Sequence, residues 1–311
     1  MKKLLMAAAM SCAATFASAA DWTPPGPIKL MIAFAAGGGA DTQARLIAEE
    51  LENSMGWQFI PEQVTGKGGL NLAAAIKDMP ADGSVIGMVV TETLGYNMRA
   101  ADAGFTPDMF TPIATTAGFQ MGIVAPAEKG WSTFADVIDA AKAGEDIRFG
   151  TMSPKLSDLA FLLGDANGVD FNIVQVRGGR AVMDGVNAGD MDLGFMAGIQ
   201  RQGVASGDLV NLASALSGPL EQTPEAPTMA DLGVDFTADG YFVFIGPAGM
   251  DPAAQEALAA AIEGVVSDES TKAGGLVKKA FGGASVITGE DLSALVASDF
   301  ETAGELLAAA E

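Results

Sequence analysis

The chain has 311 residues, and its 39 acidic against 17 basic residues give a net charge of −22. Such a charge argues against nucleic acid or an anionic membrane as a partner. The chain has no histidine and a single cysteine, Cys12, which excludes Ser-His-Asp and Cys-His catalysis and zinc sites built on these residues. We therefore expect a non-enzymatic protein with no catalytic residues, no metal and no cofactor.

The first nineteen residues have the pattern of an export signal. Lys2 and Lys3 form a basic start, the segment 4–16 is mostly apolar, and 17–19 reads Ala-Ser-Ala. This A-x-A pattern is typical of a signal-peptide cleavage site, and the apolar part is too short for a membrane anchor. We expect residues 1–19 to be a signal peptide that is cleaved after Ala19.

A glycine-rich turn between a predicted strand and a predicted helix is the main candidate binding site. The strand covers 30–34, and Asp41 is expected to be the N-cap of a helix whose apolar stripe includes Ala44, Ile47 and Leu51. The turn has neither the dinucleotide G-x-G-x-x-G spacing nor the Gly-Lys-Ser/Thr of a phosphate loop. Unpaired N–H groups at a helix start attract anions. We expect a carboxylate or another small anion at Ala36, Gly37, Gly38, Gly39, Ala40 and Asp41.

Strands and helices alternate along the rest of the chain, which favours mostly parallel sheets flanked by helices. Predicted strands cover 57–61, 85–90, 121–125, 147–150, 173–176, 191–196, 209–213 and 241–245. Predicted helices cover 70–78, 133–143 and about 290–307, with others after 154, 180 and 251.

Two apolar extended segments, 121–125 and 241–245, are expected to connect two lobes. The first lobe would be 20–122 plus 246–311, and the second 123–245. Ligands of open α/β sheets bind beyond the carboxyl ends of the strands. The loops at 35–41, 63–69, 91–93, 151–157, 177–180 and 196–198 are therefore expected around one interlobe cleft.

Further candidate ligand residues each have a competing structural role. Arg177 follows a strand, and its planar fork suits a second carboxylate, but a solvated turn arginine fits equally well. Lys67 and Lys155 could likewise simply be solvent-exposed.

The hydroxyls at predicted strand ends are the remaining candidates. Thr91, Thr93, Thr151 and Ser153 could donate to a ligand, or they could cap turns and helices.

Several stretches, in the right order over nearly the whole chain after the signal, resemble the extracytoplasmic solute-binding proteins of tripartite tricarboxylate transporters (the Bug or TctC type). They are 36–41 with 44–51 (AGGGAD, ARLIAEEL), 62–69 (EQVTGKGG), 81–83 (ADG), 105–113 (FTPDMFTPI), 174–178 (VQVRG), 187–192 (NAGDMD), 226–233 (APTMADLG) and 246–249 (GPAG).

The resemblance implies a two-lobed periplasmic-binding-protein fold (type II) with two crossover segments as a hinge. It also implies a monomer in the periplasm that captures a small organic acid, such as a di- or tricarboxylate, and delivers it to a membrane permease. In this family the first and second glycine loops hold a carboxylate. The ligand-binding residues expected here, from the resemblance and from the residues themselves, are Ala36 to Asp41, Thr65, Gly66, Lys67, Gly68, Thr91, Thr93, Thr151, Ser153, Arg177 and Gly178.

This chain departs from the family pattern in two loops. The usual Asn-Arg-Pro of the second loop is Gln63-Val64-Thr65, and the glycine- and serine-rich loop of the second lobe is replaced at 150–158. The sequence therefore does not predict which chemical group lies at the distal end of the ligand.

Two other functions remain as alternatives. One is a periplasmic ligand sensor for a signalling partner, and the other is an exported α/β hydrolase of phosphate esters that uses the glycine loop.

Overall fold

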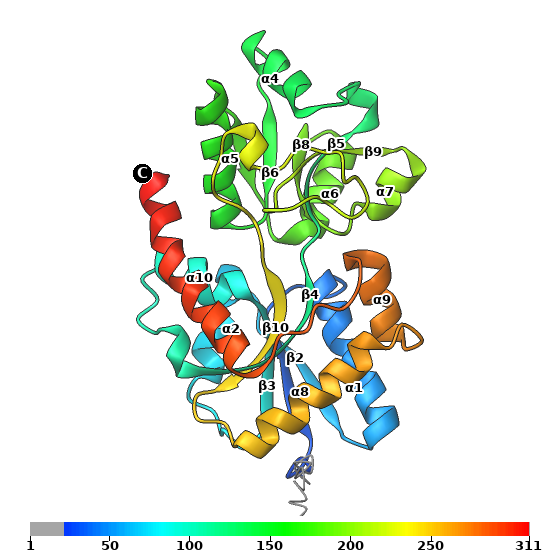
Figure 1. Cartoon of the computed structure of the whole chain (residues 1–311), viewed down its shortest axis with the longest axis vertical. Helices are drawn as coiled ribbons and strands as arrows, with labels where there is room; N and C mark the ends of the chain where they lie inside the picture. Colours follow the sequence, from blue (N-terminus) through cyan, green and yellow to red (C-terminus); the bar gives the residue numbers. More distant parts are fainter. Residues whose placement is uncertain (1–21, 311) are drawn as a thin grey trace, which may run out of the picture.

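The computed structural model describes residues 22–310, so the expected signal peptide at 1–19 lies outside the described part. Each of two lobes contains one five-stranded sheet covered by helices, and Figure 1 shows the second lobe above the first. Within 22–310, no helix combines the length and the apolar character that a membrane crossing needs.

The first lobe contains a sheet in the order β2-β1-β3-β10-β4. Its strands are β1 (Ile28–Ile32), β2 (Phe59–Gln63), β3 (Val85–Val90), β4 (Phe110–Gly118) and β10 (Tyr241–Pro247). β1 is parallel to β2 and β3, whereas β10 is antiparallel to both of its neighbours, β3 and β4. Four strands therefore run in one direction, and only the crossover strand β10 opposes them.

The sheet of the second lobe repeats this arrangement in the order β7-β6-β8-β5-β9. Its strands are β5 (Met121–Pro126), β6 (Arg148–Thr151), β7 (Asn172–Gln175), β8 (Leu193–Ala197) and β9 (Leu209–Ser214). β6 is parallel to β7 and β8, and β5 is antiparallel to β8 and β9. The expected α/β fold with mostly parallel sheets is confirmed.

Helices surround both sheets, and one of them connects the lobes. The first lobe carries α1 (Gly39–Met55), α2 (Leu70–Ile76), α3 (Met98–Ala100), α8 (Pro252–Ser267), α9 (Lys272–Phe281) and α10 (Gly289–Ala309), and the second carries α4 (Phe134–Lys142), α5 (Pro154–Asn167), α6 (Gly178–Ala188) and α7 (Arg201–Ser206). The long helix α10 rises from the first lobe to contact α5 of the second.

The core of the first lobe lies on both faces of its sheet. Alternate residues of β1 point to opposite sides, so that Leu30 packs with Ile47 of α1 while Met31 packs with Leu72 of α2. All four are almost fully buried. Burial on both faces explains why these strands are continuous apolar runs rather than alternating ones.

The two connections between the lobes lie side by side. β4 passes into β5 through Phe119 and Gln120, and the Phe119 N–H donates to the carbonyl of Gly240, just before β10, at 2.9 Å. The residues at 241–245 were expected in the second lobe, but β10 pairs in the first sheet, and Met121 already pairs in the second. Apolar extended sequence does not reveal which sheet a crossover strand joins, because either sheet would bury it.

A buried carboxylate holds one corner of the second lobe. Asp192, just before β8, is 4 % exposed and accepts hydrogen bonds from the Arg148 backbone N–H at 2.9 Å and from two guanidinium nitrogens of Arg148 at 2.9 and 3.0 Å, as well as from Lys129. Burial by itself would raise the pKa of Asp192. The hydrogen bonds outweigh it and lower the pKa to about 2.

We therefore expect Asp192→Asn to lower the free energy of unfolding at pH 7 by about 2 kcal/mol, measured by urea denaturation. Because the folded-state pKa is depressed, this contribution is complete above the ordinary value of 3.8 and is lost as the pH falls toward about 2. Between pH 3.8 and about 2, the free energy of unfolding of Asp192→Asn should therefore change less than that of the wild-type protein. Asp190→Asn, at an exposed position, is the control and should cost less than about 0.5 kcal/mol; equal losses in the two variants would contradict the assignment.

Candidate functional site

The first glycine turn connects β1 to α1 and is exposed at 35–37. The expected N-cap, Asp41, is wrong: the N-cap is Gly38, in an extended conformation, and Asp41 is the third residue of α1. The Asp41 carboxylate instead reaches back and accepts from the Gly37 N–H at 2.9 Å. An acidic residue fits both the N-cap and the third position of a helix, because both lie where unpaired N–H groups need an acceptor.

The Asp41 side chain fixes the turn to two neighbouring segments. It is 3 % exposed, and its second oxygen accepts from Arg45 Nε at 2.8 Å and from Gln63 Nε2 at 3.3 Å. Gln63 is the last residue of β2 and also donates to the carbonyl of Phe34. The first glycine turn is therefore held next to the loop that follows β2.

The start of α1 leaves a group of N–H donors without partners. The Gly38 carbonyl accepts from Thr42 at 2.9 Å, but the N–H groups of Gly39, Ala40 and Asp41 donate to no other group within 22–310. Such donors carry the positive end of the helix dipole, so they can bind an anion.

The second glycine loop offers another group of donors. Gly66, Lys67, Gly68 and Gly69 all have positive φ, at 119°, 49°, 61° and 95°. The N–H groups of the first three donate to no protein acceptor in the described part of the chain. Successive N–H groups in such a turn form a concave anion-binding surface. Lys67 is uncommon there, because positive φ is unfavourable for residues with a side chain.

Two side chains fasten this loop from behind. Thr93 Oγ1 and Asn97 Nδ2 donate to the Gly68 carbonyl at 2.7 and 3.0 Å. Both side chains belong to the π-helical turn η2 (Thr93–Asn97), and a methyl group added at Gly68 would collide with Asn97. Thr93 therefore positions the loop.

The remaining candidate hydroxyls also have protein partners. Thr91 Oγ1 accepts from the Tyr241 N–H at 3.1 Å, and Thr151 Oγ1 lies 2.8 Å from Ser157 Oγ. Ser153 is the N-cap of α5 and accepts from an N–H of its first turn at 3.3 Å. These three hydroxyls are buried and take the capping and turn-fixing roles that were the alternative.

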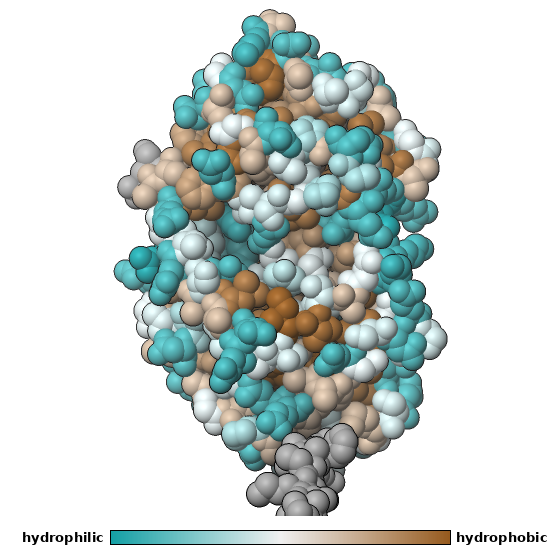
Figure 2. All heavy atoms as spheres, in the orientation of Figure 1, coloured by the Kyte–Doolittle hydropathy of each residue, from teal (hydrophilic) through white to brown (hydrophobic). Residues whose placement is uncertain are grey.

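None of the three cationic candidates forms an ion pair within residues 22–310; they are Lys67, Lys155 and Arg177. Arg177 is exposed and precedes α6, which begins at Gly178, while Lys155 is half-buried in the first turn of α5. By contrast, Arg180 pairs with Asp184 at 2.9 Å. Uncompensated positive charge at these loops is notable in a chain with 39 acidic residues. Figure 2 shows hydrophilic residues spread over both lobes.

The carboxyl ends of the parallel strands meet where the lobes touch. Phe281, the last residue of α9, lies against the first glycine turn, since a methyl group added at Gly39 would be 3.2 Å from its ring. A methyl group added at Gly198, after β8 of the second lobe, would be 3.0 Å from the same Phe281 ring. Phe281 also packs against Phe242, with ring centroids 4.9 Å apart. The turn thus faces the interlobe boundary.

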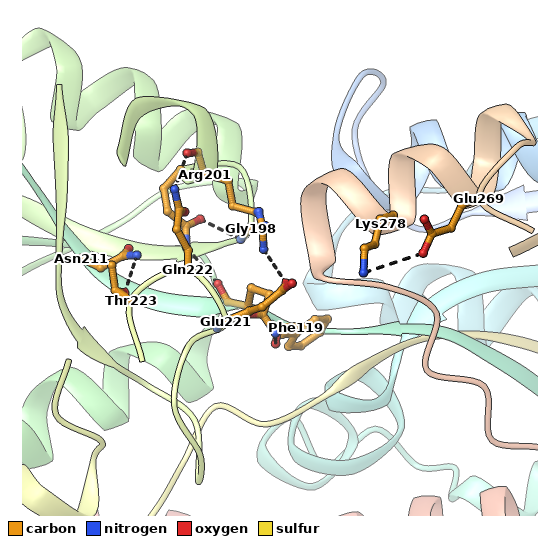
Figure 3. A network of polar contacts seen from close by, with 11 residues as sticks. Phe119, Gly198, Arg201, Asn211, Glu221, Gln222, Thr223, Glu269 and Lys278 are labelled. Carbon is orange, nitrogen blue, oxygen red and sulfur yellow. Dashed lines mark hydrogen bonds and ion pairs between the residues drawn. The ribbon is translucent and has the colours of Figure 1, made fainter. Parts of the chain in front are cut away.

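Polar groups meet at the same boundary. In Figure 3, Arg201 and Glu221 of the second lobe form an ion pair at 2.8 Å opposite the helix that carries Lys278. Glu221 approaches Gly282, which follows α9. At another point the Tyr96 hydroxyl, in η2 of the first lobe, donates to Asp158 in α5 of the second.

Sequence reasoning missed two side chains of this boundary, Phe281 and Glu92. Glu92 is the second residue after β3 and is half-buried; burial raises its pKa, while the Lys155 charge and the polar side chains of Ser153 and Asn97 act in the opposite direction. Ser153 and Lys155 belong to the second lobe, so Glu92 lies near the interlobe boundary. The available signal was a charged residue just beyond a buried strand, between the two selected threonines Thr91 and Thr93.

Two cavities of about 530 and 460 Å³ are hollowed into the surface of the first lobe. One is lined by residues around Trp57 and Phe59, the other by residues around Arg99 and Phe300. Neither is lined by a predicted ligand residue. Among the predicted residues, Gly39 lies at the interlobe boundary, because Phe281 contacts both Gly39 and Gly198 of the second lobe.

Asp41→Ala should loosen the first glycine turn. It removes a buried acceptor of three hydrogen bonds, and we expect the free energy of unfolding to fall by about 2–4 kcal/mol in urea denaturation. Arg45→Ala is the matched control: it breaks only the half-exposed ion pair and should cost about 0–1 kcal/mol. If both variants lost the same amount, the carboxylate would not be what holds the turn.

The sequence and the fold resemble those of known proteins. BugT of Bordetella pertussis is 28 % identical over 249 residues, which cover 75 % of this chain and 74 % of BugT. The UPF0065 protein of the gbd 5′ region of Cupriavidus necator is 26 % identical over 253 residues, covering 79 % of this chain and 76 % of that protein.

Solved structures share the fold. The periplasmic binding protein BugD superposes with a TM-score of 0.80 at 22 % identity, covering 93 % of this chain and 98 % of BugD. Rpa4515 of Rhodopseudomonas palustris, solved with adipate, gives 0.81 at 20 % identity over 93 % of this chain and 98 % of that one. MatC of the same organism, with bound malate, superposes with a TM-score of 0.77 at 19 % identity, covering 91 % of this chain and 99 % of MatC.

Residues 43–282 match the family described as tripartite tricarboxylate transporter family receptor, TctC. This segment contains the second glycine loop, both crossovers and the whole second lobe. The chain belongs to the TctC family of solute-binding receptors.

Proposed function

We propose that this protein captures a small carboxylic acid between its two lobes. The observation that carries the proposal is the presence of two donor groups, the N–H groups of 39–41 and those of 66–68, that have no protein partner within residues 22–310. The hydrogen bond between Asp41 and Gln63 joins the segments that carry them. Adipate and malate, which are bound in the related structures Rpa4515 and MatC, support this class of ligand.

Binding would use the first lobe as a preformed seat and the second as a cover. The acid would enter while the lobes are apart, and N–H groups of the glycine loops would bind its carboxylate. Hinge bending at 119–120 and 239–240, where the connections cross, would bring Lys155 and Arg177 over the ligand. The predicted ligand residues Ala36 to Asp41, Thr65 to Gly68, and Gly178 would contribute backbone contacts.

The available contacts are sufficient for useful affinity. A hydrogen bond to a charged group is worth roughly 1.5–3 kcal/mol, and a micromolar dissociation constant needs about 8 kcal/mol. About four to six such contacts therefore suffice after the cost of ordering the lobes.

The cellular setting follows from the family. We propose that the mature chain works as a monomer in the periplasm, after cleavage near Ala19, and delivers its ligand to a tripartite transporter permease. A sensor that docks on a signalling protein would share the same ligand site. Within residues 22–310, the side chains bonded to the backbone of Gly37 and Gly68 are Asp41, Thr93 and Asn97, a set that does not favour the hydrolase alternative.

The proposal predicts that at least one acid in a panel of small mono-, di- and tricarboxylates raises the melting temperature by several degrees, because a ligand that binds only the folded state stabilises it. The measurement is a thermal-shift screen of protein refolded to remove co-purified ligand. If no acid of the panel shifts the transition, the protein does not bind this ligand class.

For an acid found in that screen, Arg177→Gln should weaken binding about 3- to 30-fold in calorimetric titration, because it removes an unpaired cation at the interlobe edge. Arg180→Gln is the control: it removes the same charge three residues away, from an arginine already paired with Asp184, and should change the affinity less than about twofold. Equal effects would place Arg177 outside the binding site.

A further inference from the structure

One aromatic ring of the first lobe touches the second lobe beside the two connections. Phe281, the last residue of α9, is 7 % exposed, and its ring packs on Phe242 of β10 with centroids 4.9 Å apart. Phe242 in turn packs on Phe119, between β4 and β5, at 5.2 Å. Because Phe119 and Phe242 belong to the two crossovers, Phe281 lies next to the segments at which the lobes would bend.

The second lobe meets this ring with bare backbone. Gly198, the first residue after β8, has a φ of 119°. A methyl group added there would be 2.5 Å from the carbonyl oxygen of Ala280 and 3.0 Å from the Phe281 ring. Both distances are well inside the optimum for non-bonded atoms, so only a residue without a side chain permits this approach. The two lobes are therefore already as close at this point as their atoms allow.

Both sides of the contact are held in place. The Gly198 N–H donates to Gln200 Oε1 at 2.7 Å, and Gln200 Nε2 donates to the carbonyl of Gln120, in the crossover itself, at 2.9 Å. Figure 3 shows this part of the second lobe opposite α9. On its other side the Phe281 ring lies against Gly39, where an added methyl group would be 3.2 Å away. Close-packed parts resist compression, so the contact opposes further closure.

The place of the contact in the sheets gives it leverage over the rest of the cleft. β8 lies next to the crossover strand β5, whereas β7, which precedes Arg177, lies two strands beyond β8. Neighbouring strands are about 4.8 Å apart, so the Arg177 loop lies roughly 10 Å farther across the sheet than Gly198. When a lobe rotates about the crossovers, a small displacement at Gly198 becomes a larger one at Arg177.

We propose that Phe281 and Gly198 form a stop that limits how far the lobes close, and that this stop selects dicarboxylic acids by chain length. The inference rests on the proposed function, because the acid is then held by the glycine loops at one end and by the Arg177 loop at the other. Phe281 acts as a positioning residue and needs no contact with the ligand. An acid that is too short does not reach both ends once the stop is met, and one that is too long keeps the lobes apart.

The first test measures closure directly. The expected mature chain has no cysteine, because Cys12 lies in the expected signal peptide. Spin labels can therefore be attached at Ala205→Cys on α7 and Glu263→Cys on α8, both at exposed positions. The distance between the labels is measured by pulsed electron paramagnetic resonance, with and without acid. Gly198→Ala should lengthen the shortest populated distance, and Phe281→Leu should shorten it.

Each variant has a matched control. Gly207, also in the second lobe, has a φ of 81°, but a methyl group added there meets no atom within 4 Å. Gly207→Ala therefore adds backbone strain without a stop. Phe134→Leu removes the same volume as Phe281→Leu from a fully buried position on α4, at the end of the second lobe far from the crossovers (Figure 1). Neither control should change the shortest distance.

The second test measures chain-length preference. The probes are malonate, succinate, glutarate, adipate and pimelate, titrated calorimetrically after removal of co-purified ligand. One methylene group in a fitted site changes affinity about tenfold or more. Relative to the acid that the wild-type protein binds best, Gly198→Ala should favour the next longer acid, and Phe281→Leu the next shorter one, each by at least about threefold. The controls should leave the order of the five affinities unchanged.

The outcomes separate this inference from the function on which it rests. If both variants moved the preference in the same direction, or no further than the controls, length selection would be wrong and acid capture would stand. The same holds if the protein bound another acid but none of the five dicarboxylates. If no acid bound at all, both proposals would fail, although the label distances would still report on the stop. Gly198→Ala with its control Gly207→Ala decides the matter even if Phe281→Leu fails to fold.

Discussion

The buried carboxylate of Asp41 is the constraint on which the site depends. One oxygen accepts from the Gly37 N–H and the other from Arg45 and Gln63, so a single side chain joins the end of β1, the first turns of α1 and the end of β2. Because Asp41 satisfies an N–H before the helix, the N–H groups of the helix start remain available. A glycine turn without this anchor would be a flexible loop; with it, the donors are held in place before any ligand arrives.

Much of the fold was readable from the sequence, because strands buried on both faces are continuous apolar runs and the helices between them carry one apolar stripe. The sheet to which β10 belongs was not readable, since Tyr241 to Ile245 would be buried in either lobe. The N-cap was misplaced by three positions, at Asp41 instead of Gly38, because composition reveals that Asp41 is an acceptor but not where in the helix start it lies. Glu92 and Phe281 were missed because their importance comes from the opposite lobe, and packing between distant segments leaves no local pattern.

Charge is distributed unevenly between the surface and the interlobe boundary. The surface is strongly acidic, which favours solubility but repels free acids at long range. Close to the loops, unpartnered N–H groups and unpaired cations reverse this effect over a few ångströms, within the distance at which salt does not screen them. Carboxylates also lie at the interlobe boundary, among them Glu221 next to Gly282 and Asp158 next to Tyr96. The boundary is therefore polarised, with donors at the glycine loops and acceptors between η2, α5 and α10.

The position of β10 also determines the order in which the molecule can assemble. It lies between β3 and β4, yet it is made after the entire second lobe, because the residues from Met121 to Gly240 separate it from its partner β4. As the chain emerges from the ribosome, the second lobe can complete its sheet while the first still has a gap at its centre. Both open edges of that gap are apolar strands, which in an unfinished chain are prone to pair with other molecules. Nascent chains of this architecture thus expose these edges until β10, which ends at Pro247 of 311 residues, has been synthesised.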